Sequence, residues 1–191
     1  MKKYETIDEL LAEMTALKDG ELPWYLMQGS FDRLPDDISR SVLWAAAIPH
    51  WYKRSIICHL VPEATSDSIN LLNEQIFTES FQGKGRNIHE LSRILLLEKM
   101  EPGLFLKLSS RAEEFFRPVY LSFDPTQAWD TPWLDLSEWA YHKSMSDVAP
   151  VNALIERCEP LKSYADCSLL YALTTKRDEA LALLTKKGIN T

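Results

Sequence analysis

Histidine and cysteine are the side chains of this sequence best suited to metal binding, but their spacing does not form a metal site. The four histidines stand far apart in the chain, at His50, His59, His89 and His142. A specific zinc motif needs ligands at short, fixed spacing, as in HExxH or a CxxC pair, and the sequence has neither. Cys58 and His59 are adjacent, but neighbouring residues of a helix point in different directions. We therefore predict no bound metal and no cofactor.

A catalytic nucleophile would need an activating base within reach, and no local pattern supplies one. Gly29-Ser30 lacks the flanking glycine of a GxSxG turn. The fold could bring Cys58 together with His89 or His142, although free cysteines are usually small buried hydrophobic residues. We predict no catalytic residue. An enzyme whose site is assembled from sequence-distant residues remains the alternative function.

Gly83-Lys84-Gly85-Arg86 is a short basic segment that precedes an expected helix capped by Asn87. A helix N-terminus with basic side chains beside it can bind an anion. The segment lacks the length of a GxxxxGK[ST] loop, and no strand is expected before it. An ordinary loop between helices is the favoured interpretation.

Residues 124–136 combine tryptophan, proline and aspartate in a single loop. Tryptophan is over-represented at binding hot spots, and proline lowers the cost of ordering a loop on binding. We predict that this loop forms or borders a surface that binds another protein, with Trp129, Trp133, Asp124, Asp130, Asp135 and Glu138 as its residues. The alternative is that both tryptophans fold back onto the core as structural plugs.

The charge of the chain favours a basic protein as partner over a nucleic acid. There are 21 Lys and Arg residues against 28 Asp and Glu residues, which gives a formal net charge of −7. A protein that binds phosphate backbones normally carries a basic face, whereas the basic residues here are scattered. Negative charge can steer a protein toward a basic partner. We therefore predict no binding to nucleic acid.

The distribution of apolar residues predicts a cytoplasmic protein. The apolar run at residues 42–48 is far shorter than the roughly 20 residues of a membrane span. The first residues lack the apolar core of a secretory signal. Three cysteines, Cys58, Cys158 and Cys167, suit reduced thiols better than a disulfide framework.

Apolar residues recur at helical spacing along almost the whole chain, which predicts an all-α fold of roughly nine or ten helices. The first helix begins with the capping box Thr6-Ile7-Asp8-Glu9 and ends at Gly20, and its apolar stripe is Ile7, Leu10, Leu11, Met14 and Leu17. Short connections favour antiparallel neighbours, so we expect stacked helical hairpins in a single compact domain over residues 1–191. A soft boundary is expected near residues 124–132. Residues 119–123 look strand-like but have no partner strand, so extended chain or a turn is expected there.

The last expected hairpin resembles an ankyrin repeat over residues 166–190. The positions that match the ankyrin pattern are Leu169, Ala172, Leu181, Leu183, Leu184, Gly188 and Asn190. Departures occur at Cys167 and Ser168, which replace the Thr-Pro start, and at Lys176, which replaces the glycine between the helices. The resemblance implies a protein-binding scaffold without catalysis, in which this unit packs on the preceding helices as a cap.

These features together predict an intracellular protein-binding module. An inhibitor or immunity-type factor that neutralises a basic enzyme would have this composition, and so would an adaptor that recruits a basic protein.

Overall fold

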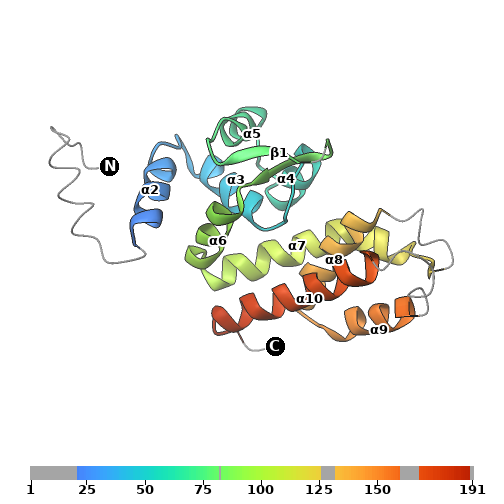
Figure 1. Ribbon diagram of the computed structural model, residues 1–191. Coiled ribbons are helices and arrows are strands. Elements are labelled where there is room, and N and C mark those ends of the chain that lie inside the picture. Colours follow the sequence, from blue (N-terminus) through green and yellow to red (C-terminus); the bar gives the residue numbers. More distant parts are fainter. Residues whose placement is uncertain (1–20, 82, 126–131, 160–167, 190–191) are drawn as a thin grey trace, which may run out of the picture.

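The computed structural model describes residues 21–81, 83–125, 132–159 and 168–189, and within them it confirms the predicted all-α fold (Figure 1). These residues form nine helices and one short β-hairpin. The helix expected over residues 6–20 lies outside the described residues. The elements in chain order are α2 (Glu21–Asp32), α3 (Asp37–Ala47), α4 (Arg54–Leu60), α5 (Ser66–Asn73), β1 (Thr78–Phe81), β2 (Gly85–Ile88), α6 (Glu90–Lys99), α7 (Pro102–Leu121), α8 (Trp133–Ser144), α9 (Ala149–Cys158) and α10 (Ser168–Lys186).

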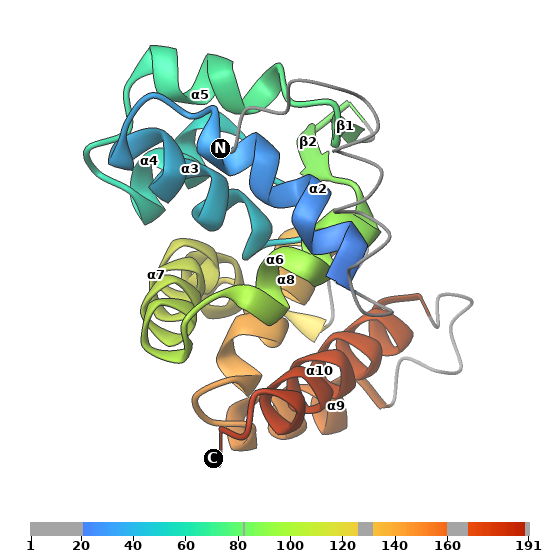
Figure 2. The ribbon, with the colours of Figure 1, turned by 90° about the vertical axis from the view of Figure 1, so that its left-hand side faces the viewer.

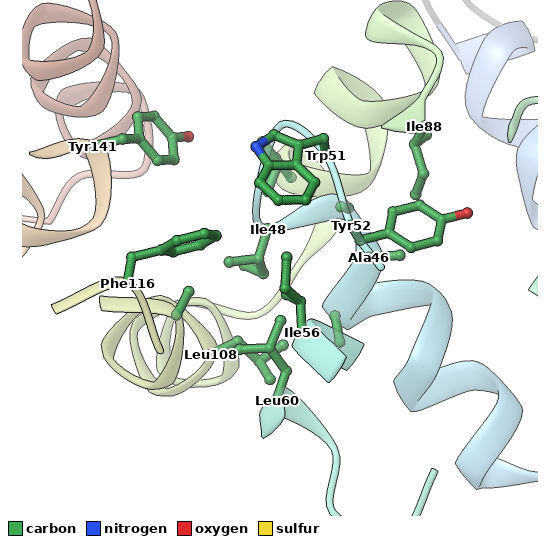
Figure 3. Packing of buried hydrophobic residues seen from close by; sticks show 14 of the residues in the cluster. Ala46, Ile48, Trp51, Tyr52, Ile56, Leu60, Ile88, Leu108, Phe116 and Tyr141 are labelled. Atoms are coloured by element: carbon green, nitrogen blue, oxygen red, sulfur yellow. The ribbon is translucent and has the colours of Figure 1, made fainter. Parts of the chain in front are cut away.

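The helices form two groups that meet along α7 (Figures 1 and 2). In the first group α3 packs on α4, α5 and α6, and the β-hairpin lies beside α5. In the second group α8 packs on α7, α9 and α10. Contact between α4 and α7 joins the two groups. Figure 3 shows this junction, where Ile48, Ile56 and Leu60 face Leu108 and Phe116 of α7.

Helix α3 is the central helix that the sequence predicts. Its N-cap Asp36 accepts a hydrogen bond from the backbone N–H of Ser39 at 2.7 Å, which satisfies a donor that the helix cannot pair itself. The helix ends at Ala47, because Pro49 has no N–H to continue it. Val42, Leu43 and the alanines that follow are at most 1% exposed. The all-apolar run therefore fills the core of the first group.

Two local predictions were wrong. Residues 119–123, expected as extended chain or a turn, include the last turn of α7, which runs through Pro118 to Leu121. Asn87, expected to cap a helix, is part of β2, and His89 is the N-cap of α6.

The β-hairpin replaces the predicted loop between helices. β1 and β2 pair antiparallel, with Thr78 opposite Ile88 and Phe81 opposite Gly85. Arg86 and Tyr52 exchange backbone hydrogen bonds of 2.6 and 2.8 Å, which fix the hairpin to the chain before α4. A Cβ atom at Gly85 would lie 2.3 Å from the Tyr52 carbonyl oxygen. Only glycine fits this close approach.

In place of the hairpin expected within residues 166–190, the described residues 168–186 form one continuous helix, α10. Lys176, expected in the turn, lies in the middle of that helix. An ankyrin unit contains two helices, so the resemblance carries no further argument. The predicted end of the helix is confirmed. Gly188 has a positive φ of 66°, and the Ile189 N–H bonds to the Leu184 carbonyl as in a Schellman motif.

Leu184 gives a direct test of how α10 is held. Its side chain is 2% exposed, whereas Leu183 is half-buried. Leu184→Ala is expected to lower the free energy of unfolding by about 2–5 kcal/mol, because it removes buried methyl groups and leaves a cavity. Leu183→Ala serves as the control and should lower the free energy of unfolding by a smaller amount. Urea denaturation measures both, and equal midpoints for Leu184→Ala and the parent chain would contradict the packing of α10.

Candidate functional site

Six polar side chains from distant parts of the sequence meet where the two helix groups join. We call them the charged cluster, and they are His50, Arg93, Glu138, Tyr141, His142 and Glu179. His50 lies between α3 and α4, Arg93 on α6, and Glu179 on α10, while the other three are on α8. Arg93, Glu138, Tyr141 and His142 are at most 2% exposed. Burying this much charge is costly unless the charges pair well.

His50 bridges the two carboxylates of the cluster. Its Nδ1 lies 2.8 Å from Glu138 Oε1, and its Nε2 lies 2.7 Å from Glu179 Oε1. Its backbone N–H donates to Glu138 Oε2 at 3.2 Å. Both ring nitrogens can donate to carboxylates only in the imidazolium form. In that form His50 ties α8 to α10 through two charged hydrogen bonds.

Arg93 completes the link to α6. One terminal nitrogen donates to the Ile48 carbonyl and to the Tyr141 hydroxyl, each at 3.2 Å. The other lies 3.4 Å from Glu179 Oε1. The guanidinium also sits 5.6 Å from the centre of the Tyr141 ring, where the aromatic face attracts a cation.

The cluster strongly favours ionised carboxylates. Burial alone would raise the pKa of Glu138, but the combined effects of His50 and His142 outweigh burial and hold that pKa well below its usual value. The Glu179 pKa is lowered in the same way, against burial, by His50 and Lys176. For His142 burial is the largest effect and lowers its pKa. His142 Nε2 lies 3.6 Å from Glu138 Oε2, beyond hydrogen-bond distance.

The geometry of the cluster supports a clamp between helices more than a catalytic centre. A general base needs a ring nitrogen directed at a substrate, and both nitrogens of His50 face carboxylates. The second oxygen of Glu179 is also occupied, by Lys176 Nζ at 2.8 Å. Within the part of the chain that the structure describes, no three His, Cys, Asp or Glu side chains are arranged to hold a metal ion.

The pairs of Cys58 with His89 or His142, which the fold could have assembled, find no support in the described contacts. Cys58 is half-buried on α4, and His89 is exposed at the start of α6. His142 lies buried in the charged cluster. None of the hydrogen bonds described for residues 21–81, 83–125, 132–159 and 168–189 joins Cys58 to either histidine.

The residues of the predicted protein-binding loop have different environments. Trp129 and Asp130 lie outside the described residues. Asp124 is exposed after α7, and Trp133 is the first residue of α8, with 45% of its surface exposed. Trp133 is therefore no fully buried plug in the described structure.

The acidic part of that predicted surface is smaller than expected. Glu138 is 2% exposed and belongs to the charged cluster, so it does not lie on a surface of the free protein. Asp135 is half-buried, and burial raises its pKa against the opposing effects of Lys53 and Lys84. These two lysines offset part of the negative charge near Trp133.

The second helix group exposes three large apolar side chains at one end. Leu121 at the end of α7 is 73% exposed, and Tyr171 near the start of α10 is 74% exposed. With Trp133 they form what we call the end surface.

Helix directions place the end of α7, the start of α8 and the start of α10 at the same end of the second group (Figure 1). Stacking of Tyr120 on Trp139 and of Phe116 on His142 shows that α7 and α8 run antiparallel. The end of α7 is therefore beside the start of α8. Lys187, just beyond α10, lies over the Phe105 ring near the start of α7. The start of α10 therefore lies toward the same end of the second group as the end of α7 and the start of α8 (Figure 1).

Comparison with known proteins found no family model, no curated protein and no solved structure that matches this chain. Among the described helices, none combines the length and the apolar character required to cross a membrane.

Proposed function

We propose that the chain is a protein-binding module and that the end surface, Leu121, Trp133 and Tyr171, contacts the partner. The observation that carries this proposal is the exposure of one aliphatic and two aromatic side chains, from three helices whose ends lie toward the same end of the second group. Tryptophan and tyrosine are enriched among the residues that contribute most to binding energy. They bury a large apolar area and keep a polar group for the rim.

The scaffold makes these side chains suitable as anchors. Trp133 is held by the first turn of α8, where the backbone N–H groups of Asp135 and Leu136 bond to the Pro132 carbonyl. A rigid anchor loses little conformational freedom on binding, so more of the contact energy contributes to affinity. Clustered exposed apolar residues commonly mark interaction sites.

The charge supports a partner with an apolar pocket and a basic rim. The chain carries a net charge of −7, and Asp124 is exposed next to the end surface. Lys53 and Lys84 near Asp135 weaken the negative field locally. Apolar anchoring is therefore the main source of affinity in this proposal, and charge mainly accelerates encounter. An inhibitor or immunity-type factor that neutralises a basic protein, or an adaptor that recruits one, would use such a surface.

The alternative is an acid–base enzyme that uses the charged cluster. The structure does bring six polar residues together from distant segments, as that alternative requires. Their mutual hydrogen bonds favour a structural role, because every side-chain nitrogen and oxygen of His50 and Glu179 already has a partner within the protein. Protein binding is therefore the better supported function.

Trp133→Ala is the variant that tests this proposal. A photoreactive residue at position 171 first cross-links the partner in cells, and the identified partner is then purified and titrated by calorimetry. Trp133→Ala is expected to raise the dissociation constant about 30-fold, equivalent to about 2 kcal/mol, the hot-spot threshold. The thermal midpoint of the free variant should stay close to that of the parent chain.

Leu106→Ala is the matched control, because Leu106 is 38% exposed near the other end of α7. Its dissociation constant should equal that of the parent chain. If Trp133→Ala instead lowers the melting temperature by several degrees and leaves affinity unchanged, Trp133 is an architectural residue and the proposal fails.

A further inference from the structure

A groove between α2 and α6 is bordered by apolar side chains that the described residues leave uncovered. It has a volume of about 360 Å³. Met27 of α2, Phe77, and Leu91 and Leu95 of α6 line it. Ile76 at its rim is 99% exposed and Leu91 is 69% exposed. Two large aliphatic side chains in water beside a groove indicate an apolar occupant.

The start of α2 lies beyond one end of the groove, beside the end of α6. The Lys99 ammonium at the end of α6 lies 5.7 Å from the centre of the Trp24 ring, near the start of α2. Further along α2, Met27 and Ser30 face Leu91 near the start of α6. The two helices therefore run antiparallel, and the start of α2 lies beside the end of α6.

The chain before α2 has the pattern and the length to fill this groove. Residues 6–20 carry a capping box, a terminal glycine and one apolar stripe at helical spacing, which is Ile7, Leu10, Leu11, Met14 and Leu17. As a helix, residues 7–17 would extend about 15 Å, and α2 with its 12 residues extends about 18 Å. Gly20 suits the reversal between two such helices.

We propose that residues 6–19 fold back as an amphipathic helix antiparallel to α2 and bury their apolar stripe in the groove. Folding back from the Lys99 end places Leu10 and Leu11 over Leu91, with Ile7 toward Ile76. The direct covalent connection gives the segment a millimolar effective concentration at the groove, which favours it over a separate protein. This covering leaves the end surface free and does not depend on the proposed function.

Accessibility of a thiol at position 91 tests the proposal in the full chain. Leu91→Cys is alkylated with a maleimide, and each cysteine is followed by peptide mass analysis. Alkylation is expected to be about tenfold slower than in Leu121→Cys, which corresponds to a docking preference of about 1.4 kcal/mol. Leu121 is 73% exposed and lies outside the groove, so it gives the unprotected rate.

Two further variants identify the occupant. Leu10→Ser with Leu11→Ser should restore the fast rate at position 91, because the stripe loses its central apolar pair. Ala12→Ser with Ala16→Ser should leave the slow rate unchanged, because a helix places these positions opposite the stripe. Cys158 is 1% exposed and reports folding in every sample, since it becomes reactive only if the chain unfolds.

Three results would overturn the inference. Position 91 could react as fast as position 121 in the chain with an unchanged N-terminal segment. Protection could persist in the Leu10→Ser and Leu11→Ser chain while Cys158 stays unreactive. Protection could also rise with protein concentration together with a dimer mass by light scattering, in which case a second copy covers the groove.

Discussion

Replacing Glu138 by alanine is expected to lower the free energy of unfolding by about 3–5 kcal/mol, since it breaks a buried ion pair and leaves the ring Nδ1 and the backbone N–H of His50 without their acceptor. Glu138 is 2% exposed and accepts hydrogen bonds from the ring and the backbone N–H of His50. His142 also lies against it. A domain is typically stable by only about 5–15 kcal/mol, so this loss is a large fraction of the total. Urea denaturation at neutral pH measures it.

Asp178→Ala is the matched control for Glu138→Ala. Asp178 pairs with Arg177 at 2.8 Å, but its side chain is 59% exposed on α10. Exposed ion pairs contribute about 0–1 kcal/mol, because water and salt screen them. Equal losses for the two variants would show that Glu138 contributes no more than a surface charge and would contradict the clamp.

The clamp also has a pH signature. The pKa values of Glu138 and Glu179 lie below their usual 4.5 in the folded state. As the pH falls, the unfolded chain therefore binds more protons than the folded chain. Their contribution to stability is full above about pH 4.5 and is lost as the pH falls through the folded pKa values. Burial lowers the pKa of His142 from 6.5, so His142 also contributes stability that is lost as the pH falls, and this loss begins at a higher pH. Glu138→Ala should therefore show a shallower loss of stability below pH 4.5.

The helical part of the fold could be predicted because its signals are local. Pro49 after an apolar run marks the end of α3, and Gly188 marks the end of α10. The β-hairpin could not be predicted from pattern, since its strands carry no clear alternation of apolar residues. Gly83, with a φ of 69°, was its only local turn signal. Its position depends on the pairing of Arg86 with Tyr52, which is distant in sequence.

The continuous helix α10 shows where a resemblance misleads a sequence interpretation. A turn was expected at Lys176, because the ankyrin resemblance places the glycine between the two helices at this position. In the structure Lys176 and Arg177 are helical and paired, Lys176 with Glu179 in the same helix and Arg177 with Asn152 of α9. Lysine and arginine are good helix formers, so intrinsic propensity agrees with the structure.

The charged cluster was the part of the candidate site that the sequence concealed. Its only local signal is Glu138 and His142, which share one face of α8 at i and i+4 spacing. His50, Arg93 and Glu179 come from three other segments, and only tertiary packing brings them to Glu138. Glu138 was therefore placed with the acidic residues of the neighbouring loop, because charge alone does not distinguish a buried carboxylate from an exposed one.

Trp139→Ala is expected to destabilise the protein by about 3–5 kcal/mol, the range for truncating a buried tryptophan. Trp139 is 1% exposed, and its ring stacks on Tyr120 with 3.8 Å between ring centres. Its Nε1–H donates to Glu113 Oε1 at 3.0 Å. The substitution removes the stacking and leaves a cavity between α7 and α8, the two helices whose ends carry Leu121 and Trp133.

Trp139→Phe separates packing from hydrogen bonding at this position. Phenylalanine keeps an aromatic ring against Tyr120 but cannot donate to Glu113. Arg117 still binds the Glu113 carboxylate at 2.5 and 3.0 Å, so that acceptor keeps a partner. The loss should be near the lower end of the roughly 1–3 kcal/mol expected for an unsatisfied buried group. If Trp139→Phe lowers the free energy of unfolding as much as Trp139→Ala does, the hydrogen bond to Glu113, and not the packing of the ring, holds α8 against α7. A loss below about 1 kcal/mol for Trp139→Ala would contradict its burial between these helices.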